Sequence, residues 1–126
     1  MTVFVMQSEL TKKQCSNLMF VYIIECSDGS LYTGIAKDVA ARLKEHYHQL
    51  PNCAKYTRSH PMKGIKCIWL TDDKVTACQL EYRIKKLTKK QKVALIAQPE
   101  TAAKLPIDGK VTWISGEEQQ KIFEQL

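Results

Sequence analysis

The sequence predicts a small α/β domain in which a three-stranded, mostly antiparallel sheet is flanked by helices. Two runs of β-branched and aromatic residues, 20–26 and 31–35, are separated by a short turn, as in a β-hairpin. A third apolar run, 66–71, follows a long polar segment, and helix-start patterns come after it. This order of elements is typical of an α/β layer whose sheet begins as an antiparallel pair.

The turn of the hairpin decides which side chains share a face of the sheet. A two-residue loop would put Tyr22 and Tyr32 on opposite faces, because a shift of one residue reverses the direction of every side chain. A three-residue loop, 27–29, pairs Tyr22 with Gly34 and puts both tyrosines on one face. We favour the three-residue loop, because its third residue is Gly29 and that position needs a positive φ.

Helices are expected before and after the third strand in the sequence. Asp38 is the predicted N-cap of a helix to about residue 49, with Val39, Leu43 and Tyr47 as its buried stripe. The segment 51–64 is expected to be a long loop. The later elements, expected from capping patterns and a proline stop, are a helix from Thr76 to Leu87, a short helix from Thr88 to about Ala97, an end at Pro99, a weak strand over 111–114 and a last helix opened by Ser115. We therefore expect an N-terminal arm (1–18), one domain (19–97) and a C-terminal extension (98–126).

Charge and composition restrict the class of function. The formal net charge is +6, which favours a polyanionic partner such as a nucleic acid. The five cysteines are scattered and contain no Cys-x-x-Cys pair, which argues against a structural zinc site or a disulfide framework. No secretory signal and no apolar run of bilayer length is present, so we expect a cytoplasmic protein with no membrane partner.

Basic residues are concentrated in two segments. Six of the ten residues from 83 to 92 are basic and none is acidic, and the segment 55–63 adds further cations and a tyrosine for stacking. A solvated helix face is the alternative, but the two segments together favour a phosphate-contacting surface. The residues we assign to it are Lys55, Tyr56, Arg58, Lys85, Lys86, Lys89 and Lys90.

Four residues could carry chemistry, although each has an ordinary structural alternative. Tyr32 precedes Gly34, whose missing side chain could let a phosphate approach, but a strand tyrosine is usually a packing residue. Arg42 and His46 are four apart and project from one helix face, which could simply be exposed. Glu81 lies on an otherwise apolar and basic helix, where its alternative role is a surface ion pair with the lysine four residues later.

The order of these residues resembles that of the GIY-YIG nuclease superfamily. The motif residues are Phe20-Val21-Tyr22, Tyr32-Thr33-Gly34, Arg42 and Glu81, and the resemblance covers about 19–92. It is strongest to the small single-domain bacterial members called YhbQ-like. The resemblance implies a GIY-YIG endonuclease-like fold and a metal-dependent endonuclease that acts on DNA, with RNA not excluded and with a structure-specific role in repair or recombination by analogy.

The resemblance also implies a role for each residue. Tyr32 would activate or position the attacking water, and Tyr22 would orient that water and the scissile phosphate. Arg42 would hold the phosphate and its developing charge. His46 would relay a proton or contact the phosphate, and Glu81 would bind one Mg²⁺ or Mn²⁺ ion.

Three residues depart from the common pattern of the motif, and the asparagine that follows the glutamate in several nucleases of the superfamily has no clear counterpart here. Phe20 stands where glycine is usual, Thr33 where an aliphatic residue is usual, and Ile35 where some relatives have a lysine. Lys37 could supply that positive charge and contact the nucleic acid. Two alternatives to the enzyme are a non-catalytic nucleic-acid-binding module with the same fold, and an interaction protein whose C-terminal extension binds a protein partner.

Overall fold

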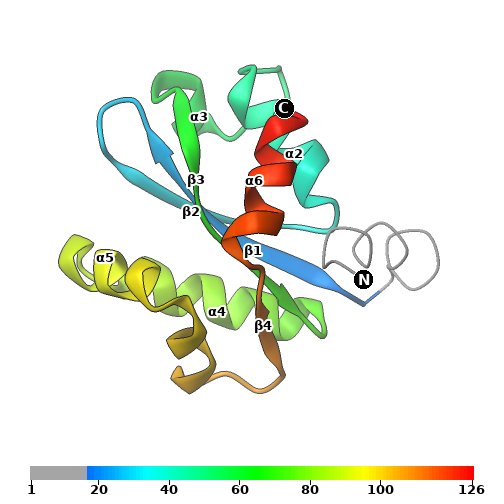
Figure 1. Ribbon diagram of the computed structural model, residues 1–126, viewed down its shortest axis with the longest axis vertical. Helices are drawn as coiled ribbons and strands as arrows, with labels where there is room; N and C mark the ends of the chain where they lie inside the picture. The colour runs from blue at the N-terminus through cyan, green and yellow to red at the C-terminus, as the bar shows by residue number, and fades with distance from the viewer. Residues whose placement is uncertain (1–16) are drawn as a thin grey trace.

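The structure is a computed structural model, and it describes residues 17–126 (Figure 1). The predicted arm, 1–18, lies almost wholly outside the described residues. The elements, in chain order, are β1 (Met19–Cys26), β2 (Leu31–Ala36), α2 (Val39–Tyr47), α3 (Lys55–Ser59), β3 (Met62–Thr71), α4 (Lys74–Lys86), α5 (Lys89–Ala97), the 3₁₀-helix η1 (Pro99–Lys104), β4 (Val111–Trp113) and α6 (Gly116–Glu124). Within 17–126, none of the helices has the length and apolar character needed to cross a bilayer.

The four strands form one antiparallel sheet in the order β2-β1-β3-β4. The predicted α/β class, with an antiparallel sheet flanked by helices, is confirmed. The sheet has one strand more than the three expected, because β4 pairs with the last three residues of β3. Helices α4 and α5 lie on one side of the sheet and α2 and α6 on the other (Figure 1).

The central strand β1 is buried on both faces, and each face contributes to a different hydrophobic core. Val21 and Ile23 pack with Leu80 and Ile84 of α4. The alternate residues of β1, Tyr22 among them, pack with α2 and α6 instead. This alternation follows from the two-residue period of a strand. It places the Tyr22 ring under α2, where the predicted helix residues lie.

The hairpin has the register that the sequence favours. Tyr22 pairs with Gly34 across β1 and β2, and Ile24 pairs with Tyr32. The Gly29 backbone has a φ of 85°, and its N–H donates to the carbonyl oxygen of Cys26 at 2.8 Å. The three-residue loop is therefore confirmed, and both tyrosines lie on the α2 face of the sheet.

The C-terminal segment 98–126 shares the sheet and the core of the preceding residues. The Ile114 N–H donates to the carbonyl oxygen of Ile68 at 2.9 Å, just before α6 begins. Ile114 and Ile122 are fully buried in the core that also contains Tyr22. Ile114, which follows β4, and α6 therefore help to form the core that contains Tyr22.

Two of the expected helix features are wrong. Thr76 is not the N-cap of α4, because the side chain of Asp73 accepts the backbone N–H of Thr76 at 2.7 Å and the helix begins at Lys74. On α2, Tyr47 is 41% exposed, while His46 is fully buried. The inward residues are thus spaced at four and seven positions from Val39, which is the ordinary period of a buried helix face.

The predicted loop 51–64 is also only partly a loop. It contains α3, a helix of five residues with no side-chain cap, and the beginning of β3 at Met62. The sequence does not indicate the first residues of β3, because they lack a regular alternation of buried and exposed side chains. Their pairing with β1 is irregular, with register shifts after Ile23 and Glu25. The caps at Asp38, Thr88 and Ser115 are as predicted, and Thr88 forms a full capping box.

Candidate active site

Tyr22 lies at the centre of the predicted site residues. Its ring crosses the backbone of β2 at Gly34, and a Cβ atom added to Gly34 would collide with the phenol oxygen. The space beside Gly34 is therefore filled by Tyr22 and not open to a phosphate, which corrects the sequence-based expectation. The absence of a side chain at Gly34 serves instead to admit the phenol to the face of the sheet.

A test of this packing compares two glycines. We expect Gly34→Ala to lower the free energy of unfolding by about 1–3 kcal/mol, since overpacking a buried site forces its neighbours to move. Gly64→Ala is the matched control, because a Cβ at Gly64 would meet nothing within 4 Å. Urea unfolding of both variants measures the difference, and equal stabilities would contradict the role of Gly34.

His46 is buried between Tyr22 and α3. Its Nε2 lies 2.7 Å from the Tyr22 phenol oxygen, and its Nδ1 lies 2.9 Å from Oγ1 of Thr57. The side chain is fully buried. Direct contact with a phosphate is therefore not available to His46, and of the two roles expected for it only the relay agrees with this geometry.

Burial and nearby charge shift the pKa values of this pair in opposite directions. Burial, followed by the positive charge of Arg42, lowers the pKa of His46 to about 4. Burial and the neighbouring Tyr32 raise the pKa of Tyr22 well above its ordinary value, while Arg42 acts in the opposite direction. Both groups are therefore neutral at neutral pH.

The lowered pKa of His46 makes stability depend on pH. The folded chain takes up this proton only near pH 4, whereas the unfolded chain takes it up near the ordinary value of 6.5. Above about pH 6.5 His46 is neutral in both the folded and the unfolded chain, so it does not change the stability. Below this pH the free energy of unfolding falls by about 1.4 kcal/mol per pH unit towards pH 4, because only the unfolded chain binds the proton. We expect wild type to lose roughly 3 kcal/mol relative to His46→Gln over this range. Urea unfolding of both proteins between about pH 7 and pH 4 measures the difference, and parallel curves would exclude it.

Tyr32 lies at the edge of the cluster and is only partly buried. Its ring is 5.7 Å from that of His46 and is stacked on Tyr56 of α3 at 5.5 Å. Nζ of Lys85 lies 6.0 Å from the centre of the same ring. Tyr32 thus lies between the buried Tyr22–His46 pair and groups predicted to contact nucleic acid.

Arg42 is held by groups on its own side of the sheet. It donates to Glu45 Oε1 at 2.7 Å and to the carbonyl oxygen of Asn52 at 2.5 Å. The positive charge of Arg42 also lowers the pKa of Tyr22, against the effect of burial. The sequence reasoning missed Glu45, although its spacing of three residues from Arg42 is one at which helix side chains meet.

Glu81 comes from α4, on the other side of the sheet. Its side chain is 23% exposed, and its carboxylate forms an ion pair with Lys85 at 3.2 Å, so the structural alternative considered for Glu81 is present. Its charge also raises the pKa of Tyr22, together with burial and Tyr32. Lys85, the partner of Glu81, also lies 6.0 Å from the centre of the Tyr32 ring, so Glu81 is linked to Tyr32 through Lys85.

A model of the GIY-YIG catalytic domain family matches residues 18–94, which is more than half of the chain. The chain belongs to the GIY-YIG family. The match agrees with the family resemblance expected from the sequence. The matched range includes Tyr22, Tyr32, Arg42 and Glu81.

Several bacterial proteins are similar to this GIY-YIG chain. The UPF0213 protein of Fusobacterium nucleatum is 42% identical over 85 residues, which cover 68% of this chain and 83% of that protein. A UPF0213 protein of Staphylococcus aureus strain Mu50 is 43% identical over 79 residues, covering 63% and 94%. A solution NMR structure of the UPF0213 protein BH0048 from Bacillus halodurans is 35% identical, with a TM-score of 0.43, and the match covers 72% of this chain and 99% of that one. The name UPF0213 states no activity.

The basic residues of this GIY-YIG domain have varied surroundings. Lys89 donates to the carbonyl oxygen of Gly29 in the hairpin turn at 2.9 Å, and Lys86 lies 5.2 Å from the centre of the Tyr82 ring. Arg58 donates to the carbonyl oxygen of Pro51 at 3.5 Å. The remaining lysines assigned to nucleic-acid contacts, Lys37, Lys55 and Lys90, are exposed. Only Tyr56 and Lys85 of this set are in ring contact with Tyr32 in the described part of the chain.

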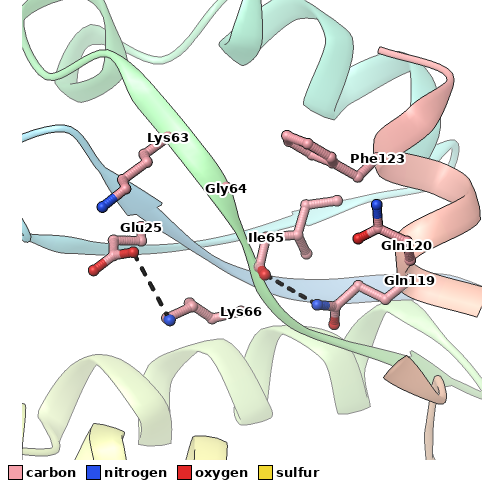
Figure 2. A pocket seen from close by; sticks show the side chains of 8 residues that line it. All are labelled: Glu25, Lys63, Gly64, Ile65, Lys66, Gln119, Gln120 and Phe123. Atoms are coloured by element: carbon pink, nitrogen blue, oxygen red, sulfur yellow. Dashed lines mark hydrogen bonds and ion pairs between the residues drawn. The ribbon is translucent and has the colours of Figure 1, made fainter. Parts of the chain in front are cut away.

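A separate pocket of about 250 Å³ lies between β3 and α6 (Figure 2). Phe123 points into it from α6, and Gln119 beside it donates to the carbonyl oxygen of Ile65 at 2.9 Å. On its other side Lys66 and Glu25 form an ion pair at 3.8 Å. None of the predicted catalytic or nucleic-acid-binding residues lines this pocket.

Proposed function

We propose that this protein is a metal-dependent endonuclease that hydrolyses phosphodiester bonds in DNA and acts in the cytoplasm. The observation that carries the proposal is the position of Tyr32, whose ring contacts His46, the hydrogen-bond partner of Tyr22, and lies 6.0 Å from Nζ of Lys85, the ion-pair partner of Glu81. Membership of the GIY-YIG catalytic domain family supports the nuclease class. By analogy with that class, branched or flapped DNA in repair or recombination is the proposed substrate.

The phenol of the partly buried Tyr32 activates or positions the attacking water, and the buried phenol of Tyr22 orients this water and the phosphate. Arg42 neutralises the charge that develops on the phosphate, and its contacts with Glu45 and Asn52 hold the guanidinium in place. The stacking of Tyr32 on Tyr56 limits the directions that the phenol can take. These side chains supply positioning and charge stabilisation, which are the main requirements of phosphodiester hydrolysis.

Glu81 fits a metal that is bound by one protein carboxylate. Mg²⁺ usually keeps several waters and takes one or two carboxylates together with substrate phosphates. Residues 17–126 contain no group of three or more candidate ligands, and the Glu81 carboxylate is exposed enough to reach solvent. An ion bound there would polarise the phosphate and would replace Lys85 as the partner of Glu81. The freed Lys85, with Lys37 and the basic residues of α3 and α5, would then contact the DNA backbone.

A cleavage panel tests the proposal. The purified protein is incubated with labelled duplex, flapped, branched and single-stranded DNA, and with RNA, in Mg²⁺ or Mn²⁺ and in EDTA. We expect Mg²⁺-dependent cutting of at least one DNA substrate, and Arg42→Ala should remove it. Binding without cutting on every substrate would instead support a non-catalytic nucleic-acid-binding module. The ion pairs that already occupy Arg42 and Glu81 are the observation that favours this second function.

A further inference from the structure

Thr57 of α3 is fully buried and connects His46 to the backbone before the helix. Its hydroxyl oxygen lies 2.9 Å from His46 Nδ1 and 3.0 Å from the carbonyl oxygen of Ala54. A carbonyl oxygen can only accept, so both contacts of Thr57 are hydrogen bonds only when its one hydroxyl proton is donated to Ala54. The contact with His46 is then filled only if Nδ1 carries a proton and donates it to Thr57.

The proton on Nδ1 determines the direction of the next hydrogen bond. A neutral imidazole has one N–H, so Nε2 is an acceptor and the Tyr22 hydroxyl, 2.7 Å away, donates to it. In the opposite tautomer Nε2 would donate to Tyr22, and the phenol proton would lose the acceptor that His46 gives it. Arg42, whose positive charge acts on this phenol, could not replace that acceptor, because a guanidinium only donates. The low pKa of His46 agrees with a neutral ring, because burial and Arg42 both disfavour the charged form.

We propose that Thr57 is a positioning residue that holds neutral His46 in its Nδ1–H tautomer, so that the Tyr22 proton points inward and the phenol oxygen offers its lone pairs to the site. This is the tautomer in which both contacts of Thr57 and the contact between His46 and Tyr22 are hydrogen bonds. Its consequence for catalysis rests on the proposed function: Tyr22 accepts a hydrogen bond from the attacking water and from Arg42. Thr57 therefore sets the direction of the hydrogen bond between His46 and Tyr22, although it does not contact Tyr22 through this bond.

The tautomer can be measured without any activity. Ring ¹⁵N NMR at about pH 7.5 distinguishes protonated from unprotonated imidazole nitrogens, and the spectrum of His46→Gln assigns His46 among the three histidines. We expect wild type and Thr57→Ser to carry the proton on Nδ1, and Thr57→Val to lose this preference. Thr33→Val is the matched control, because Thr33 is a buried threonine whose hydroxyl has no hydrogen-bond partner in residues 17–126. A wild-type ring protonated on Nε2, or an unchanged ring in Thr57→Val, would overturn the proposal.

Cleavage rates test the catalytic consequence. Loss of one hydrogen bond of about 1 kcal/mol corresponds to roughly a fivefold fall in rate for Thr57→Val, with Thr57→Ser within about twofold of wild type. Equal rates in the two variants, with both folded by circular dichroism, would remove the positioning role. If wild type cleaves nothing, the nuclease proposal fails, and the NMR result still decides whether Thr57 controls the tautomer.

Discussion

Tyr32→Phe is expected to reduce the rate of DNA cleavage by about 10²–10⁴-fold, the usual contribution of a side chain that takes part in proton transfer. The substitution removes only the phenol oxygen. The phenyl ring keeps its stacking on Tyr56 and its contact with His46, so the fold should be unchanged. Single-turnover cleavage with saturating enzyme measures the chemical step separately from binding.

The control for this variant is Tyr47→Phe. Tyr47 is on α2, is 41% exposed and has ring contacts with His48 and Phe123 that a phenylalanine would keep. We expect its cleavage rate to match wild type. Equal rates in wild type and Tyr32→Phe would contradict a catalytic role for Tyr32, and equal rates in Arg42→Ala as well would point to a contaminating nuclease.

Glu81→Gln is expected to reduce cleavage at least about 100-fold at a fixed Mg²⁺ concentration, because a neutral amide is a weak ligand for a hard cation. The side chain keeps its size, so the packing of α4 should be retained. A titration with Mg²⁺ gives the clearest result. The variant should need a higher metal concentration, whereas a defect in folding alone would lower the rate without shifting the titration.

Glu124→Gln is a control with the same change in net charge. Glu124 is exposed at the end of α6, outside the range that matches the family. Its cleavage rate and Mg²⁺ titration should coincide with those of wild type. A shift of similar size in both variants would show that the effect comes from overall charge and not from a metal ligand at residue 81.

Much of the fold could be predicted because it depends on local signals. The glycine in the hairpin turn fixes the register, so the shared face of Tyr22 and Tyr32 followed from residues close in sequence. Caps such as Asp38 and Thr88 are also local, since the side chain bonds a backbone N–H two or three residues away. Helix α3 and the start of β3 have no such signal, because a five-residue helix is too short to show a period.

The sequence by itself determined which chemical groups this protein has and the order in which they occur: two phenols on one face of the hairpin, a guanidinium on the next helix and a carboxylate on a later one. Only the tertiary structure decided that Gly34 admits the Tyr22 ring, that His46 is enclosed and that Thr57 bonds it. The reason is that sequence periodicity shows which face a residue occupies, whereas hydrogen-bond direction and burial depend on contacts between α2, α3 and β1. Those contacts exist only once the helices pack on the sheet.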